Sequence, residues 1–200
     1  RQRQMCIRDS LEVDQREMNS KIYYIRYPID NSSEFITIAT TRPETMLGDT
    51  AIAVNPKDKR YKNYVGKTVT IPIVGRKIKI IKDNYADPEQ GTGALKITPA
   101  HDFNDYDVGQ RNKLEIINVF TEEGKINDNA PKDYIGLDRF DARKKILNEL
   151  KEKDFFVKEE NIKNKVPYGD RSNSVIEPFL TEQWFVDAKK LAIKAKKIVK

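Results

Sequence analysis

Two segments, residues 40–54 (TTRPETMLGDTAIAV) and residues 91–109 (GTGALKITPAHDFNDYDVG), hold most of the side chains in this chain that could do chemistry. Within ten residues the second segment gathers a lysine, a threonine, a histidine and two aspartates: Lys96, Thr98, His101, Asp102 and Asp105. Carboxylates beside backbone N–H groups and a lysine suit a ligand that carries an ammonium group and a polar ester or hydroxyl. We therefore expect the two segments to form the edges of one polar pocket.

The aspartate pair also has a purely structural interpretation. Asp102 is a good helix N-cap, and Asp105 lies three residues later, where a carboxylate can bond back to the cap in a capping box. That box needs only two residues, whereas Lys96 and Thr98 lie in the same segment. We interpret His101 as a local hydrogen-bonding or packing residue rather than a general base.

A strand-to-helix corner must position the first segment. Residues 35–41 alternate apolar and polar side chains as in a half-buried strand, and the alternation stops at Arg42. Pro43 suits the first turn of a short helix, where its missing N–H costs nothing. Thr41, Arg42 and Thr45 are therefore predicted to crowd one corner.

The rest of the chain is rich in strand signals. We expect one hairpin from residues 21–29 and 34–40 and a second from residues 67–74 and 77–83. We also expect a further strand at residues 114–120 and one long helix at residues 138–153. A short strand at residues 94–98 precedes a helix that begins at Asp102. Pro72 places its strand at an edge or bulge. These elements predict an α+β fold with a barrel-like mixed β-sheet flanked by short helices.

The charge of the chain is unevenly distributed. The 200 residues carry a formal net charge of +6, of which residues 1–10 contribute +2 and residues 187–200 contribute +5, leaving −1 for residues 11–186. The central part is not basic overall, so any RNA contact there must come from local patches. Residues 188–199 have apolar side chains at helical spacing, and we expect a helix there.

Residues 1–10 (RQRQMCIRDS) show no apolar periodicity, and we interpret them as a non-native segment. They contain the only cysteine, Cys6, so the remaining chain offers no disulfide, thiol nucleophile or cysteine-based metal site. We expect no metal ion in the site. The lack of cysteines and of a long apolar run favours a cytoplasmic protein without a membrane span.

Four ordered blocks in this sequence resemble the editing domain of valyl-tRNA synthetases. They are TTRPETMLGDTAIAV, GTGALKITPAHDFNDYDVG, GLDRFDARKKIL and VIEPFLTEQWFV. The resemblance covers about residues 21–188. It implies an editing domain at residues 11–165, followed at residues 166–200 by an incomplete ribbon and helix that re-enter the class I nucleotide-binding domain. Trp184 and Phe185 are expected to be packed in that ribbon.

The resemblance also implies an activity, the hydrolysis of threonine from mischarged threonyl-tRNA(Val). In this interpretation Asp105 holds the α-ammonium group, Asp102 and Thr98 read the threonine hydroxyl or a bridging water, and other residues orient the terminal adenosine, the ester and the attacking water. The substrate-binding candidates are Thr41, Arg42, Thr98, Asp102 and Asp105. The catalytic candidates are Thr45, Lys96, Asp102 and Asp105.

The implied partners are the 3′ end of tRNA(Val) carrying threonine and the rest of a synthetase chain. Editing needs no cofactor. The parent ligase uses ATP, but the His-Ile-Gly-His and KMSKS signatures of its active site are missing from this sequence, so we expect no aminoacylation. Two alternatives stay open: a module that binds the tRNA acceptor end but is inactive in isolation, or the editing domain of a leucine or isoleucine enzyme. HDFNDY and RPETMLGD favour the valine enzyme.

Overall fold

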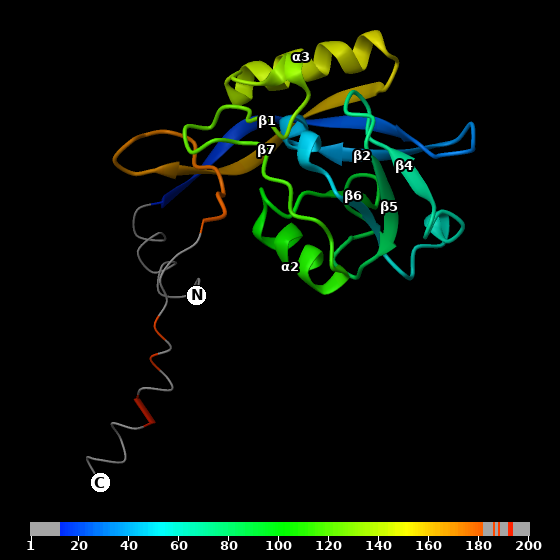
Figure 1. Cartoon of the computed structure of the whole chain (residues 1–200), viewed down its shortest axis with the longest axis horizontal. Helices are drawn as coiled ribbons and strands as arrows, with labels where there is room; N and C mark the ends of the chain where they lie inside the picture. Colours follow the sequence, from blue (N-terminus) through cyan, green and yellow to red (C-terminus); the bar gives the residue numbers. More distant parts are fainter. Residues whose placement is uncertain (1–12, 182–185, 187, 189–191, 194–200) are drawn as a thin grey trace.

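A computed structural model describes residues 13–181, together with residues 186, 188, 192 and 193. Within these residues the strands form two sheets (Figure 1). The first has the order β2-β1-β7 and is antiparallel, with β1 at Val13–Pro28, β2 at Phe35–Thr40 and β7 at Phe156–Gly169. The second is mixed and has the order β4-β5-β3-β6, with β3 at Ala51–Val54, β4 at Thr68–Thr70, β5 at Lys77–Lys82 and β6 at Ala94–Ile97.

Both predicted hairpins are confirmed. β1 pairs with β2, and alternate side chains of β1, among them Ile25 and Tyr27, enter the core as the period-2 pattern requires. β4 pairs with β5 and lies at the edge of its sheet, as Pro72 indicated. The α+β class is confirmed, but the described strands form two separate sheets and no closed barrel.

The central strand β3 explains why the second sheet holds the site firmly. β5 pairs with one edge of β3 in parallel and β6 with the other edge antiparallel. All four residues of β3 are buried, because Ile52 and Val54 pack into one apolar cluster and Ala51 and Ala53 into another. This pairing brings Ile52 opposite Lys96. The chain segment that leads into β3 therefore lies beside the strand that carries the predicted lysine.

The strand β7 was not predicted. It pairs with β1 from Val13 opposite Gly169 to Ile25 opposite Phe156, and the two strands form a long ribbon (Figure 1). The amino-acid pattern carried no strand signal, because no residue of this strand is fully buried and charged or amide side chains occur on both of its faces. The predicted domain boundary between residues 165 and 166 lies inside β7, and the domain division stays a prediction.

The strand predicted at residues 114–120 is wrong. The described structure there contains only an isolated bridge between Phe120 and Ile126. Side chains, rather than a neighbouring strand, bond to this backbone: Asn127 Nδ2 donates to the carbonyl oxygens of Asn118 and Phe120, at 2.9 and 3.2 Å. Within this irregular segment only Val119 and Phe120 are buried, and Ile116 is 40% exposed.

Helices cover the two sheets on opposite sides (Figure 1). The helix α3, Arg139–Glu152, begins after Asp138, whose side chain accepts from the N–H of Phe140, as predicted. Its buried face consists of Ala142, Ile146 and Leu150, whereas Phe140 is 40% exposed. The helix α2, Phe103–Asn112, lies beside the second sheet.

Short 3-10 helices occur at Pro43–Gly48 (η1), Lys59–Tyr61 (η2) and Lys132–Tyr134 (η3). The predictions for residues 1–10 and for Trp184 and Phe185 lie outside the described residues, as does most of the predicted C-terminal helix.

Candidate functional site

The structure brings the two motifs together at the corner between β2 and η1. Pro43 occupies the start of η1 as predicted, and all six residues of this 3-10 helix are buried. The corner packs beside β6, so that the Lys96 ammonium donates to the Thr45 hydroxyl at 2.7 Å. Residues 51 positions apart in the sequence therefore share one hydrogen bond, which confirms that the two segments form one polar region.

Every proton of the Lys96 ammonium is used inside the protein. Besides Thr45, Nζ donates to Thr98 Oγ1 at 2.5 Å and to Asp49 Oδ1 at 3.0 Å. An ammonium group has three N–H donors, so these contacts satisfy all of them. Lys96 is only 6% exposed. Thr45 and Thr98 are also buried.

Asp49 is the site residue that the sequence interpretation missed. Its carboxylate is fully buried and accepts from Lys96 and from the Thr98 hydroxyl on Oδ1, the latter at 2.6 Å. The Tyr27 hydroxyl donates to Oδ2 at 2.8 Å. Burial raises the pKa of Asp49, and the Lys96 charge opposes this rise. A buried lysine requires a counter-charge, and that requirement was the signal that could have led to Asp49.

The two aspartates at the start of α2 make different contacts. Asp102 caps the helix, as predicted, and its Oδ1 accepts from the N–H groups of Asn104 and Asp105 at 2.8 and 3.1 Å. Asp105 differs from the expected capping box, because its Oδ2 accepts from the Thr98 N–H at 2.8 Å. The carboxylate thus points toward β6 rather than back to the cap.

The environment of Asp105 is unfavourable for its charge. Burial raises the pKa of this carboxyl to about 6, although Lys96 and the Thr98 N–H oppose the rise. Asp102 and Asp49 add to it. A carboxylate held in this way is a strong partner for an incoming cation, because an ammonium group would replace the missing solvation.

His101 is a packing residue, as predicted. Its Nε2 accepts from the N–H of Val119 at 2.9 Å, and its ring lies 4.6 Å from that of Phe120, centroid to centroid. Burial lowers the pKa of His101 to about 3, so the ring is neutral. Its Nδ1 has no partner among the described residues.

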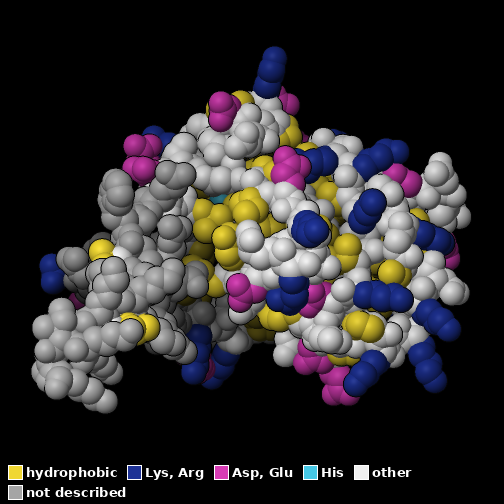
Figure 2. Space-filling model, turned by 60° about the horizontal axis from the view of Figure 1, so that its bottom comes forward, with side chains coloured by type: hydrophobic (Ala, Val, Ile, Leu, Met, Phe, Trp, Pro, Cys, Tyr) yellow, Lys and Arg dark blue, Asp and Glu magenta, His cyan; other side chains and the backbone are white. Residues whose placement is uncertain are grey.

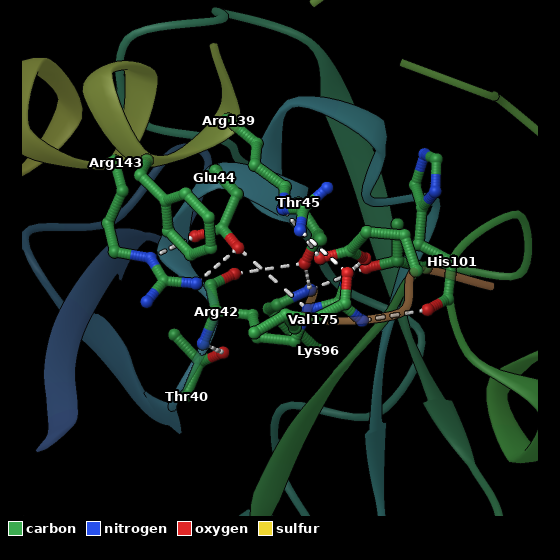
Figure 3. A network of polar contacts seen from close by, with 12 residues as sticks. Thr40, Arg42, Glu44, Thr45, Lys96, His101, Arg139, Arg143 and Val175 are labelled. Atoms are coloured by element: carbon green, nitrogen blue, oxygen red, sulfur yellow. Dashed lines mark hydrogen bonds and ion pairs between the residues drawn. The ribbon is translucent and has the colours of Figure 1, made fainter. Parts of the chain in front are cut away.

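Arg42 belongs to a second network, drawn in Figure 3. Its Nη1 donates to the carbonyl oxygen of His101 at 2.9 Å, and its Nη2 pairs with Glu177. Glu177 also pairs with Arg139 Nε at 3.3 Å. Burial raises the pKa of Glu177, and the Arg42 charge opposes the rise. The Arg42 side chain is 28% exposed, so one edge of this group reaches the surface.

The second network continues into α3. Arg143 donates to both carboxylate oxygens of Glu44, at 2.7 and 2.6 Å, in the bidentate geometry typical of strong pairs. Glu44 is fully buried, and Arg42 Nε lies 3.8 Å from it. This network therefore joins the corner at η1 to α3 and to the segment around Glu177.

The remaining predicted residues lie nearer the surface. Thr41 and Asp102 are partly exposed.

A surface hollow of about 360 Å³ lies elsewhere, between Asp30–Ser32 and Gly66–Thr68, and no predicted site residue lines it. The described residues contain no cluster of His, Cys, Asp and Glu that could hold a metal ion. In the same part of the chain, no helix is long and apolar enough to cross a membrane.

Comparisons with known proteins place this arrangement in a class. The family model described as "Leucyl-tRNA synthetase, editing domain" matches residues 62–137. Among solved structures, the fold is similar to GlLeuRS-CP1, with a TM-score of 0.55 and 13% identity over 70% of this chain and 99% of that one. It is also similar to the Agrobacterium radiobacter K84 agnB2 LeuRS in its ternary complex LeuRS-tRNA-LeuAMS, with a TM-score of 0.55 and 20% identity over 82% of this chain and 22% of that chain. The chain is thus similar in fold, and in part in sequence, to the editing domains of aminoacyl-tRNA synthetases.

Sequence relatives give the particular branch, because those at high identity are valine–tRNA ligases. The ligase of Pelagibacter ubique is 84% identical over 189 residues, which cover 94% of this chain and 22% of the relative. Those of Caulobacter vibrioides and Thermotoga maritima are 51% and 53% identical over 94% and 92% of the chain, and 23% and 21% of their own length. The chain spans about a fifth of the length of these relatives and over that part is similar to the valine branch of the synthetases.

Proposed function

We propose that this domain hydrolyses the ester between threonine and the 3′-terminal adenosine of tRNA(Val), as the editing part of a valine–tRNA ligase. The observation that supports the proposal is the contact between the two motifs, in which Lys96, Thr45 and Thr98 lie bonded together beside the buried carboxylate of Asp105. The high identity to valine–tRNA ligases supports the choice of tRNA.

The physical problem is the discrimination between valine and threonine. The two are nearly isosteric, and a hydrophobic pocket rejects an added hydroxyl poorly; valyl-tRNA synthetase is itself the documented example of this limit and of the second, hydrolytic site that overcomes it. A polar site works in the opposite sense, because valine would leave its buried hydrogen-bonding groups without partners. Such a site accepts threonine and leaves valine attached.

The predicted roles fit the observed positions. Asp105 holds the α-ammonium group, and Asp102 with Thr98 reads the hydroxyl or a bridging water. Arg42 and Thr45 at the corner, together with Lys96 on β6, orient the terminal adenosine, the ester and the attacking water. Thr41 is a further substrate-binding residue.

We assign no side-chain nucleophile. His101 is the only histidine of the chain, and its Nε2 already accepts from the Val119 N–H. Burial lowers the pKa of His101 to about 3, so the ring is too weak a base to activate a serine. Hydrolysis then rests on a positioned water and on stabilisation of the developing oxyanion. No cofactor takes part in this step. ATP belongs to the aminoacylation reaction of the parent ligase.

A second candidate function is acceptor-end binding without hydrolysis. Lys and Arg side chains gather on one side of the face shown in Figure 2. Four lysines line a hollow of about 110 Å³: Lys57, Lys59, Lys62 and Lys82. The central domain is not basic overall, so such a local patch is what phosphate contacts would require. In this alternative the rest of the synthetase chain places the substrate.

The test is deacylation of threonyl-tRNA(Val) and valyl-tRNA(Val) by the 200-residue chain. We expect hydrolysis of the threonyl ester alone. Asp105→Ala should reduce the rate by about a hundredfold or more, because the ammonium group loses its buried partner. Asp107→Ala on the same helix is the matched control, because Asp107 is exposed, and should leave the rate unchanged.

Circular dichroism of each variant separates loss of activity from loss of fold. A folded Asp105→Ala variant that deacylates normally would refute the role of Asp105. If the folded wild-type chain binds threonyl-tRNA(Val) but hydrolyses nothing, the binding function is correct and the hydrolase proposal is wrong.

A further inference from the structure

A buried ion pair lies directly behind the two residues proposed to contact the ligand. Lys96 lies on β6, and Asp49 lies between η1 and β3; their charged atoms are 3.0 Å apart. The side chain of Asp49 is fully buried and that of Lys96 is 7% exposed. Neither charge has room to reach solvent.

The pair makes contact with the ligand-binding layer through Thr98. Its hydroxyl lies between the two charges, accepting from Lys96 at 2.5 Å and donating to Asp49 at 2.6 Å. Its backbone N–H donates to Asp105. The ion pair therefore fixes both the hydroxyl and the backbone of the residue that holds the Asp105 carboxylate.

We propose that Asp49 is a positioning residue for the editing site: it anchors the Lys96 ammonium and the Thr98 hydroxyl so that the Asp105 carboxylate is held in place and kept charged for an ammonium ligand. This inference rests on the proposed function for its ligand, the α-ammonium group of an esterified amino acid. Asp49 contacts no ligand itself and acts through Lys96 and Thr98.

The orientation of the pair gives it this effect. Among the charges that face Asp105, Lys96 on β6 has the largest influence and stabilises the carboxylate, whereas Asp102 at the N-cap of α2 and Asp49 destabilise it by less. Tyr85 lies close enough to be influenced by Asp105 and Asp102. The pair thus presents its positive end to Asp105.

Anchoring by Asp49 is needed because Lys96 is buried. Without the carboxylate, the ammonium would keep only two neutral hydroxyl partners, which do not compensate the loss of solvation. Tyr27 secures the other oxygen of Asp49, and Arg76 Nη2 donates to its backbone carbonyl at 2.8 Å. Asp49 is therefore fixed from three directions, as a positioning residue should be.

The test follows the titration of Asp105 by the ¹³C signal of its carboxyl group in the free 200-residue chain. Wild type should titrate with a midpoint near pH 6. Asp49→Asn leaves the buried Lys96 without a counter-charge, so the ammonium loses its place or its proton, and the midpoint of Asp105 should rise by about one pH unit. The double variant Asp49→Asn/Lys96→Met should show the same rise, because Lys96 no longer stabilises the Asp105 carboxylate once Asp49 is absent.

The double variant also guards against unfolding, because replacing both partners of a buried pair with neutral groups of similar size is often tolerated. Asp128→Asn and Lys79→Met carry the same chemical changes at exposed positions and should leave the midpoint unchanged. Structural damage that lets water reach Asp105 would lower the midpoint toward the ordinary value of the carboxyl group, in the opposite direction. The inference is overturned if Asp49→Asn lowers the midpoint or leaves it unchanged, because Lys96 would then keep its place and its charge without Asp49.

An activity arm separates this inference from the proposed function. In the deacylation of threonyl-tRNA(Val), the pH at which kcat/KM reaches half its maximum should follow the NMR midpoint in each variant. Raised NMR midpoints in both variants, with no hydrolysis by wild type, would support the role of Asp49 and refute the hydrolase. Hydrolysis by wild type, with the midpoint unchanged in both variants, would support the hydrolase and refute the role of Asp49.

Discussion

Two buried ion networks meet at the corner between β2 and η1, and they differ in what they connect. The inner network, consisting of Thr45, Asp49, Lys96 and Thr98, joins residues of one half of the domain and balances one positive charge with one negative charge. The outer network joins elements 99 and 135 positions apart and contains three arginines and two glutamates: Arg42, Glu44, Arg139, Arg143 and Glu177. The inner network builds the site, and the outer network attaches distant chain segments to it.

Exposure also separates the two networks. All four side chains of the inner network are buried, whereas Arg42 and Arg143 are 28% and 25% exposed. The outer network has an excess of one positive charge, and two of its arginines are partly exposed. The same chemistry of basic side chains and carboxylates therefore supports an internal scaffold in one place and a partly exposed bridge between distant segments in the other.

The largest effect is expected when the inner network is broken on one side. Lys96→Met leaves the Asp49 carboxylate buried without its counter-charge, which should lower the free energy of unfolding by about 3–5 kcal/mol. Urea unfolding followed by circular dichroism measures this loss. Lys79→Met, at an exposed position, should change stability by less than about 0.5 kcal/mol. A loss as small as the control would show that the inner network is not a scaffold.

A smaller effect is expected from the pH dependence of stability beside the inner network. The pKa of Asp105 is raised from 3.8 to about 6 on folding, so the folded protein binds this proton more tightly than the unfolded chain. Stability from this group is therefore greatest below about pH 4 and is lost as pH rises to about 6, by about 3 kcal/mol.

Asp105→Asn should abolish this component, and unfolding curves at several pH values for both proteins measure it. An identical pH dependence in the two proteins would contradict the raised pKa. The same group is mostly ionised at pH 7, so the domain tolerates an unfavourable charge where a cationic ligand would bind.

The smallest effect is expected in the outer network. Glu44→Gln keeps the shape of the side chain but removes the charge that Arg143 contacts through two hydrogen bonds, and should cost about 2 kcal/mol. Part of this cost should disappear at high salt, because Arg143 is partly exposed. Unfolding at low and high salt tests this. A loss equal to that of Lys96→Met and independent of salt would remove the distinction between the networks.

The sequence predicted those parts of the molecule whose signals are local. The alternation in residues 35–40, the caps at Asp102 and Asp138 and the proline at residue 43 each determine a strand end or a helix start through neighbouring residues. The two motifs were predicted to meet because both carry polar groups at such ends. Their contact is confirmed, while the ligand roles of these residues stay predictions.

The features that sequence reasoning missed depend on distant partners. Asp49 gains its role from Lys96, 47 positions away, and no local pattern marks it. β7 carries polar side chains on both faces, and the segment forms a strand because its backbone pairs with β1. The segment at 114–120 had the apolar pattern of a strand, but the side chains of His101 and Asn127 bond to its backbone instead.

The ribbon formed by β1 and β7 has a mechanical consequence. Val13 and Gly169 are paired at one end of it, so the two ends of this long stretch of chain emerge about one strand spacing apart, roughly 5 Å. A polypeptide joined at these two points would therefore have its attachment sites as close together as the two ends of a hairpin. A force that pulls the two ends apart would break the pairs of the ribbon one after another. The load would therefore reach the cluster around Lys96 only after the ribbon had opened.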